Sequence, residues 1–362
     1  MFSSRQGNID LTLLGLITIG VFIGIILLFS ANHFEWALPL KQLTKGSLAI
    51  IFFGALAMTD DRTIRDSSFP LFIFSLILLL IVLYYGDTTK GAQRWLNLGI
   101  VKFEPSELVK ITLPLSLASH IHKHGIPIQG WPLITAITML LVPFFLVLKQ
   151  PDLGTALIIL FIGSITLFIA GLSRKIILIT IIATFATIPI LWHQLHAYQQ
   201  QRIITLFSEN EDLKHHGYHI HQSKIAIGSG GLWGKGYGNG EQVQLGYIPE
   251  HKTDFIFTVL SEEFGFFGNI VWLMVILSIG FRSIYLGYKQ PQVFNKLVCI
   301  ALGCGFMLNA WINMAMVSGI IPVVGVPLPL LSYGGTSFVA TLVSLSIILK
   351  LGHVNPKRQH LW

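Results

Sequence analysis

The feature that most constrains this fold is a series of long apolar runs that recur from residue 11 to residue 352. Each run is long enough to cross the roughly 30 Å hydrocarbon core of a bilayer as a helix. The runs lie at 11–30, 43–59, 69–85, 104–121, 132–148, 153–171, 174–193, 264–287, 293–318 and 333–352. Only 11% of the residues are charged, against about 25% in soluble domains. The sequence therefore predicts an all-α, polytopic integral membrane protein with about ten transmembrane helices.

The first run has one basic residue, Arg5, ahead of it and no small-residue cleavage site after it, so we expect a retained helix rather than a signal peptide. An even helix count with the N-terminus inside puts both termini in the cytoplasm. The longest loop, 194–253, then lies outside, between predicted helices 7 and 8. The predicted cytoplasmic segments carry a modest excess of Lys and Arg, as the positive-inside rule requires. Without a repeat of about 20–50 residues, residues 1–362 are predicted to be a single domain.

The formal charge of +7 fits contact with anionic membrane lipids. The basic residues are scattered among short loops and form no stripe, so we expect no nucleic-acid partner. Polar residues concentrate in four segments, 86–110, 149–156, 193–254 and 318–337. All four lie at or just beneath the predicted external face, which indicates that the protein works on that side.

Asp254 stands directly ahead of an apolar run, with Glu262 and Glu263 further along. A charge at the edge of hydrocarbon costs several kcal/mol unless it is paired or used. Asp254 beside Thr253 also has the pattern of a helix N-cap. The two glutamates either face the bundle interior or belong to an interfacial segment, with the true span beginning near Phe264. In both cases Asp254 lies at the outer boundary between water and membrane.

The stretch "FEPSELVKI", residues 103–111, places Glu107 and Lys110 on one face of a predicted helix. A buried acid and base should pair or line a wet cavity. Simple pairing is one interpretation. The functional one is that Lys110 binds a phosphate and Glu107 orients it.

The stretch "GAQRWLNLG", residues 91–99, brings Arg94 and Trp95 together on a predicted external loop. Arginine suits bidentate phosphate contacts, and tryptophan suits a sugar face. An interfacial anchor explains Trp95 equally well. The prolines and glycines of "PLPLLSYGGTS", residues 327–337, predict irregular backbone that lines a cavity.

The external loop begins its glycine-rich part, 217–240, with a short amphipathic helix that contains Lys224. The glycines permit tight turns or close approach to a ligand, or form a flexible loop without a special role. No nucleotide-binding pattern can be aligned here. The nearby histidines, His215, His216, His219 and His221, have no carboxylate or cysteine partner at ligand spacing, so we expect polar loop residues rather than a metal site.

Six stretches resemble signatures of the shape, elongation, division and sporulation (SEDS) family of bacterial membrane proteins. They are "GAQRWLNLG", "FEPSELVK", "KQPDLGTAL", "IAIGSGGLWGKG", "PEHKTDFIFTVLSEEFGFFG" and "GVPLPLLSYGGTS", and together they span most of the chain. The Val-Pro-Leu-Pro form is more similar to the elongation members than to the division members.

This resemblance implies a ten-helix fold and peptidoglycan glycosyltransferase activity on lipid II at the outer face of the bacterial cytoplasmic membrane. It also implies work beside a class B penicillin-binding protein, a transpeptidase. The family's essential acid maps to Asp254. Here Lys252 separates His251 from Thr253, which leaves the role of His251 open.

Lipid II is a disaccharide-peptide on undecaprenyl diphosphate. A GlcNAc 4-hydroxyl attacks the anomeric carbon of another unit's MurNAc and displaces diphosphate, which inverts an α link to a β-1,4 bond. Because diphosphate is a good leaving group, one general base and cationic stabilisation should suffice. We expect Asp254 to be the base, while Lys110 and Arg94, with Lys252 or a divalent cation such as Mg²⁺ or Mn²⁺, hold the diphosphate. No other cofactor and no protein metal site are expected.

The substrate-binding candidates are thus Arg94, Trp95, Glu107, Lys110, Lys224 and Lys252. Two other functions stay open at this point. A transporter could flip lipid II across the membrane, but it should show repeated halves and a midplane site. A non-catalytic scaffold could recruit the crosslinking partner.

Overall fold

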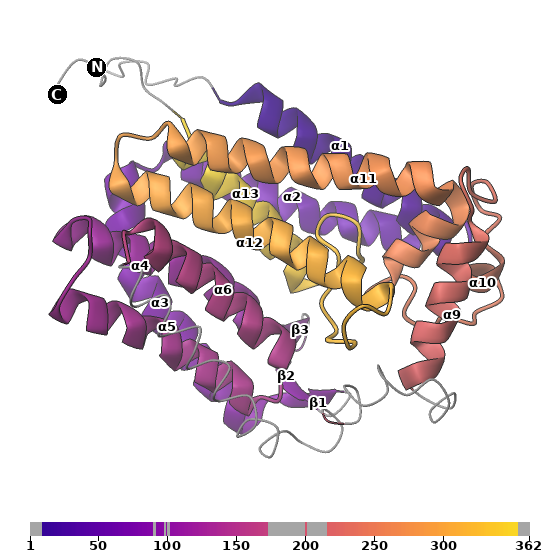
Figure 1. Ribbon diagram of the computed structural model, residues 1–362, viewed down its shortest axis with the longest axis horizontal. Coiled ribbons are helices and arrows are strands. Elements are labelled where there is room, and N and C mark those ends of the chain that lie inside the picture. The colour runs from indigo at the N-terminus through magenta and orange to yellow at the C-terminus, as the bar shows by residue number, and fades with distance from the viewer. Residues whose placement is uncertain are drawn as a thin grey trace.

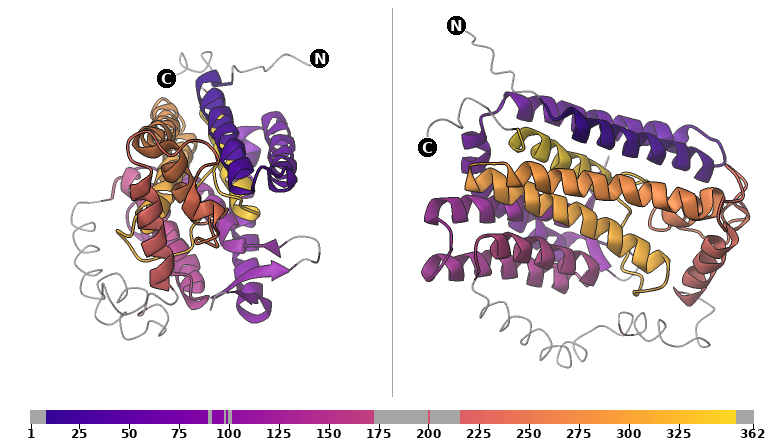
Figure 2. Two further views of the ribbon diagram at one scale, coloured as in Figure 1. Left: turned by 90° about the vertical axis from the view of Figure 1, so that its right-hand side faces the viewer. Right: turned by 45° about the horizontal axis from the view of Figure 1, so that its top comes forward.

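A computed structural model shows a bundle of long helices that run along one common axis (Figures 1 and 2). The structure describes residues 9–89, 92–97, 99, 102–172, 200 and 216–353. The helices are α1 (Leu11–Ala31), α2 (Ala37–Met58), α3 (Asp61–Tyr85), α4 (Pro105–His124), α5 (Trp131–Lys149), α6 (Leu153–Ile169), α9 (His216–Ser229), α10 (Glu241–Gln244), α11 (Ile256–Tyr288), α12 (Val293–Val317) and α13 (Thr336–Leu351).

The prediction of a polytopic all-α membrane fold is confirmed. Each predicted span corresponds to a helix except 174–193, which lies outside the described residues. Among the described helices, 6 are long and apolar enough to cross a membrane, and α6 and α13 are shorter apolar helices. Helices α2 and α3 begin earlier than predicted because polar residues that interrupt the apolar run, Lys41 and Gln42 in α2 and Asp61 and Arg62 in α3, belong to the helix.

Helix α12 lies at the centre of the bundle and packs against α11, α4, α6 and α13. Of its most apolar window, 67% is buried, more than in any other long apolar helix described. Small residues allow this close packing. A β-carbon on Gly303 would lie 2.7 Å from Ser283 of α11, and one on Gly305 would lie 2.8 Å from Ile162 of α6.

A small antiparallel sheet, β1 (Asp87–Thr89), β2 (Ala92–Asn97) and β3 (Lys102–Phe103), stands where an external loop was predicted. Its segments are too short and polar to give a strand signal in the sequence. The register shifts between Asp87 and Thr88, which pair with Trp95 and Gln93. Arg94 is therefore the extra residue of a β-bulge, a device that re-aims a side chain.

Helix α11 is broken at Gly265, whose φ of 63° and ψ of -156° are not helical. The break separates a short helix, 256–264, from a long one, 266–288. The long half thus begins close to Phe264, the predicted start of the span, while Glu262 and Glu263 are buried in the short half. In Figure 1 the short half lies beside α9 and α10, at the right-hand end of the bundle.

The predicted irregular segment before α13 does enter the bundle. Its tip, Leu330, has a φ of 66° and packs against two glycines of α1. A β-carbon on Gly20 would lie 2.8 Å from the Leu330 side chain, and one on Gly24 would collide with the Leu330 carbonyl. The pair Gly20 and Gly24 thus opens a slot in α1 that receives this loop.

Candidate functional site

Asp254 lies in the turn that leads into α11 and is half-buried. The N-cap of α11 is Phe255, and no side chain bonds to the first turn. The N-cap interpretation of Asp254 is therefore wrong, because the helix begins one residue too late. The Asp254 carboxylate points instead toward Gly325, where a β-carbon would lie 3.6 Å from Oδ2.

Three hydrogen bonds fix the backbone that carries Asp254. The Asn313 amide of α12 donates to the Asp254 carbonyl at 2.8 Å. The Ser332 hydroxyl donates to the Thr253 carbonyl at 2.7 Å. The Tyr333 N–H donates to the Lys252 carbonyl at 2.9 Å. Three consecutive carbonyls are thus held by one helix and one loop, which presets the direction of the acid.

Asn313 is fully buried and also donates to the Val326 carbonyl at 2.6 Å. It therefore joins the segment of Asp254 to the loop that contains Gly325. Ser332 also accepts a hydrogen bond of 2.7 Å from the Leu328 N–H, which closes the turn of that loop. The "PLPLLSYGG" stretch is a cavity wall, as predicted, and it also positions the acid.

Arg94 reaches the same place from β2. Its Nε lies 3.3 Å from Asp152 Oδ2, and its side chain is 17% exposed. Asp152 is the N-cap of α6, where its other oxygen accepts the Thr155 N–H at 3.1 Å. A β-carbon on Gly325 would lie 3.6 Å from Arg94 Nη1 as well as from Asp254 Oδ2. The structure therefore brings Arg94 and Asp254 together around Gly325.

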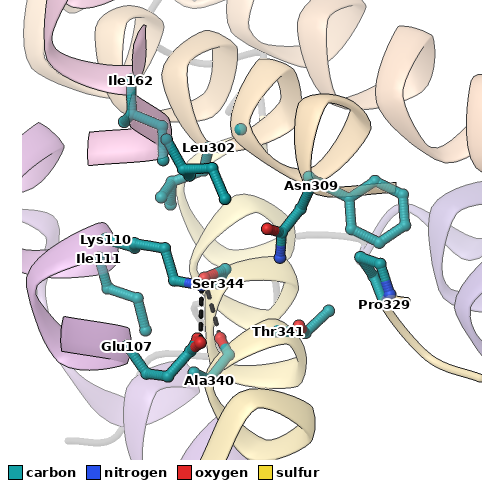
Figure 3. Close-up of a pocket in the computed structure, with 13 residues that line it drawn as sticks. Glu107, Lys110, Ile111, Ile162, Leu302, Asn309, Pro329, Ala340, Thr341 and Ser344 are labelled. Carbon is teal, nitrogen blue, oxygen red and sulfur yellow. Dashed lines mark hydrogen bonds and ion pairs between the residues drawn. The ribbon is translucent and has the colours of Figure 1, made fainter. Parts of the chain in front are cut away.

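Glu107 and Lys110 form an ion pair of 2.7 Å, with side chains only 7% and 10% exposed. They line a cavity of about 40 Å³ between α4, α6, α12 and α13. Figure 3 shows them opposite Asn309 and Ser344. A water molecule needs roughly 10–15 Å³ of such space, so the cavity has room for water but not for a diphosphate. The structure pairs Glu107 with Lys110, as the first interpretation predicts.

This cavity lies one helical turn from the Asp254 support. Asn309 lines it, and Asn313, four residues on along α12, bonds the Asp254 carbonyl. Residues at i and i+4 lie on the same face of a helix. Pro329 of the irregular loop also lines the cavity. The buried pair and the acid are therefore neighbours along α12.

His251 and Lys252 face the end of α1. The His251 ring nitrogens lie 2.6 Å from the Ile248 carbonyl and 3.0 Å from the Ala31 carbonyl. Burial lowers the pKa of His251 below its ordinary value of 6.5, although these hydrogen bonds oppose the shift. Lys252 Nζ donates to Asn32 Oδ1 at 3.0 Å. His251 is thus a packing residue, which answers the question that its spacing left open.

Lys224 and Trp95 lie apart from this centre. The predicted amphipathic helix exists as α9, and its Ser223 hydroxyl donates to the Val317 carbonyl at 2.7 Å. Lys224 lies beside Gly319, where a β-carbon would be 2.9 Å from its Nζ. The buried residues of α9 include Ile220, Ser223 and Ala226, while Ile225 is exposed. Trp95 is half-buried on β2 and pairs with Asp87.

The glycine-rich loop fills the break in α11. Loop N–H groups of Lys235 and Gly236 donate to the carbonyls of Glu262 and Glu263 at 2.9 Å and 3.0 Å. Across the break, the N–H groups of Phe266 and Phe267 donate to the carbonyls of Gly231 and Leu232 at 2.9 Å and 3.2 Å. Each helix end leaves such groups without intrahelical partners. The loop satisfies them, so it is a structural plug rather than a free loop.

A buried ion pair holds this plug in place. Lys235 Nζ lies 2.9 Å from Glu262 Oε1, which also accepts the Gln242 N–H at 3.1 Å. Glu262 is fully buried, and Lys235 is 24% exposed. The Glu263 carboxylate accepts a short hydrogen bond from Ser30 of α1. The two glutamates thus tie the short half of α11 to the loop and to α1.

No group of three or more His, Cys, Asp or Glu that could hold a metal ion occurs within the described parts of the chain. Mg²⁺ commonly takes one or two carboxylates, with substrate phosphates and waters as its other ligands. Asp254 could be such a carboxylate ligand only when a phosphorylated substrate supplies other ligands of the ion.

Sequence reasoning missed four residues of this site: Asp152, Asn313, Gly325 and Ser332. Three of them lie inside stretches that were singled out as polar or irregular, and that signal could have named Asp152 and Ser332. Asn313 lies within an apolar run and gave no signal except its polarity.

The family model described as "Cell cycle protein", FTSW_RODA_SPOVE, matches residues 8–357. Peptidoglycan glycosyltransferase MrdB of Escherichia coli K12 is 36% identical over 345 residues, which cover 95% of this chain and 93% of that protein. The Helicobacter pylori J99 protein of the same name is 36% identical over 320 residues, 87% of this chain and 83% of its own.

The chain is also similar to solved structures along most of its length. A chain from a study of the structural coordination of polymerization and crosslinking by a peptidoglycan synthase complex has a TM-score of 0.84 and 29% identity, and 95% of this chain and 98% of that chain are covered. The rod shape determining protein RodA of Thermus thermophilus has a TM-score of 0.74 and 27% identity, and 96% and 98% are covered.

Proposed function

Because this chain belongs to the SEDS family of FtsW, RodA and SpoVE, we propose that it polymerises lipid II with Asp254 as its general base. The chain is an inverting peptidoglycan glycosyltransferase of the RodA type, which joins units by β-1,4 bonds for cell-wall elongation and rod shape. The observation that carries the assignment of the base is the approach of both Arg94 and Asp254 to Gly325.

In the proposed reaction, the Asp254 carboxylate takes the proton of the acceptor GlcNAc 4-hydroxyl. The oxygen forms a bond to the anomeric carbon of the donor MurNAc, and the bond from that carbon to diphosphate breaks. Undecaprenyl diphosphate leaves with the electron pair, and Asp254 later gives its proton to water. A positioned base supplies about 10²–10⁴-fold of rate.

Arg94 is the proposed cation for the donor diphosphate, because its fork can bind two phosphate oxygens while Asp152 fixes its direction. Lys110 can reach the diphosphate only by exchanging its partner Glu107, which would then orient it. Lys252 would add charge from the α1 side. A Mg²⁺ or Mn²⁺ ion, held by Asp254 and the diphosphate oxygens, would supply further neutralisation of the leaving group.

Trp95 and Lys224 are proposed to contact outer parts of the substrate, the sugar and the peptide, because they lie away from the acid. The protein is a multi-pass membrane protein. We propose that it resides in the bacterial cytoplasmic membrane with both termini in the cytoplasm and the site facing outward. The polymerization and crosslinking complex among its structural relatives supports a class B penicillin-binding protein as its partner.

The test is Asp254→Asn, purified with its partner and checked for folding, with polymer formation from lipid II as the readout. We expect no polymer, while Asp87→Asn, an acid that is 42% exposed on β1, should polymerise normally. Normal polymer from Asp254→Asn would remove this acid from the mechanism and would favour a scaffold. Polymer from the unmodified protein in detergent, where no sidedness exists, cannot come from a flippase.

A further inference from the structure

Two lysines of α2 carry positive charge into the membrane region. Lys45 is eight residues into the helix, about 12 Å at 1.5 Å per residue, and Lys41 lies one turn nearer the outer end. Neither forms an ion pair with an acid of the described segments. Charges inside a membrane helix pair with a partner or mark a substrate path. The pair Lys41 and Lys45 therefore calls for an anion that the described segments do not supply.

Lys45 is directed at the loop that supports Asp254. Its Nζ lies 3.4 Å from the Gly334 carbonyl and 4.1 Å from the centre of the Tyr333 ring. The hydrogen bond is long and the ring contact uses no N–H donor, so the ammonium group keeps most of its hydrogen-bonding capacity. Tyr333 is the residue whose N–H bonds the Lys252 carbonyl. Lys45 thus lies on the α2 side of the site, whereas Arg94 approaches from the sheet.

The surface of α2 suits a lipid chain. Only 11% of its most apolar window is buried, against 28–67% in the other long apolar helices described. Below Lys45, the exposed large apolar side chains include Leu48, Ile50, Ile51 and Phe52, and of these Leu48 and Phe52 lie on the same face of α2 as Lys45. A lipid phosphate bound at Lys41 and Lys45 would have its hydrocarbon tail along this face.

We propose that Lys41 and Lys45 bind the diphosphate of the acceptor lipid, an inference that rests on the proposed function. The donor diphosphate is bonded to the reacting carbon, so it must lie beside Asp254, where Arg94 is. The acceptor reacts through the far end of its disaccharide, so its diphosphate must lie one disaccharide away from the acid. Lys45 contacts Tyr333, whose N–H bonds the Lys252 carbonyl two residues before Asp254, and it is the cation that we assign to this more distant diphosphate.

Lys45 could instead serve only to hold the loop, and Gln42 offers a matched control. Gln42 Nε2 donates to the Ser332 carbonyl at 3.0 Å, so it holds the same loop without charge. If Lys45 acts only through the loop, Gln42→Leu and Lys45→Met will have the same effect. If Lys45 binds phosphate, only Lys45→Met will change the half-saturating concentration of the acceptor.

The experiment follows one condensation between two lipid II analogues, with the full-length protein in nanodiscs. A 4-epimer of the GlcNAc unit can act only as donor, and a form with carbon in place of the anomeric oxygen can act only as acceptor. For Lys45→Met, we expect the half-saturating concentration of the acceptor analogue to rise about tenfold, as for loss of one charge-assisted contact. The half-saturating concentration of the donor analogue and the maximal rate should each stay within about twofold of their values in the unmodified protein. Lys45→Arg should restore binding of the acceptor analogue.

An equal shift for both analogues, a shift for the donor alone or no shift would overturn the proposal. Occupation by ordinary anionic phospholipid would also overturn it, and would appear as an effect that vanishes in nanodiscs of pure phosphatidylcholine. Failure of the proposed function is distinguishable, because Asp254→Asn would then still form product. The lysine variants, by contrast, are expected to be active at a saturating concentration of the acceptor analogue.

Discussion

Arg94 and Asp254 both approach Gly325, where a β-carbon added to the glycine would lie 3.6 Å from Arg94 Nη1 and from Asp254 Oδ2 alike. The cation comes from a β-bulge and the acid from a turn before a helix, so their meeting depends on the whole fold. A glycine at this point keeps the space between acid and cation open for substrate.

Gly325→Ala should therefore abolish most activity. The added methyl group would occupy the space between the two charges, and displacing a reacting group by about 1 Å can cost about 100-fold in rate. The φ of 70° adds strain. Gly246→Ala is the matched control, because its φ is 74° but nothing lies within 4 Å. Equal activity of the two variants in lipid II polymerisation would show that the space is not used.

Arg94→Gln should lower kcat by about 10²–10³-fold, as expected for loss of one group that stabilises developing charge. Arg94→Lys should recover only part, because an ammonium cannot bind two oxygens in a fork. Lys102→Gln, an exposed cation of the same sheet, is the control. The measurement is the initial rate at saturating lipid II. A full rate for Arg94→Gln would move the diphosphate elsewhere.

Asn313→Ala should impair both stability and catalysis. It removes two hydrogen bonds from a buried amide and leaves the carbonyls of Asp254 and Val326 without them, at a cost of about 1–3 kcal/mol. Thermal unfolding in detergent measures the first effect, and polymer formation well below the unfolding temperature measures the second. A variant that is less stable but fully active would show that Asp254 needs no such support.

Lys235→Met should destabilise the protein by about 1–3 kcal/mol, because it leaves the Glu262 carboxylate buried without its cation. Glu241→Gln removes the other partner of Lys235, but Glu241 is 72% exposed, so we expect a loss below about 1 kcal/mol. Unfolding midpoints of the two variants test this order. Negligible losses for both variants would mean that the plug is held by its backbone alone.

Stability should fall on acidification because of His251. Its pKa is lowered by burial, so the unfolded chain binds a proton at a higher pH than the folded one. The contribution is complete above the unfolded value of 6.5 and is lost as the pH falls through the folded pKa. His251→Gln should therefore flatten the pH dependence of the unfolding temperature between about pH 7 and about pH 5. An unchanged slope would assign that dependence to other groups.

The transmembrane helices could be predicted because each apolar run carries its own signal in hydropathy and length. Local charge also located Asp254, Arg94 and the pair Glu107 and Lys110, since acids and bases are rare in such a chain. Helix starts were less accurate where polar residues such as Lys41 and Asp61 belong to the helix.

What could not be predicted depends on contacts between distant segments. The bulge that directs Arg94 exists only through the pairing of β1 with β2, and the support from Asn313 joins α12 to a turn 59 residues away. The structural role of the glycine-rich loop could not be predicted from its own residues. Its role as a plug requires the break at Gly265, and no local sequence pattern predicted the non-helical backbone of that residue.

The break at Gly265 also bears on how the enzyme meets membranes of different thickness. A continuous helix would transmit every change of tilt to its outer end, and helices tilt to match the bilayer. Here residues 266–288 can adapt to the lipid while the short segment that follows Asp254 stays anchored to α1, α9 and α12. We therefore expect Asp254, the proposed base, to keep its position when residues 266–288 change their tilt with the lipid composition.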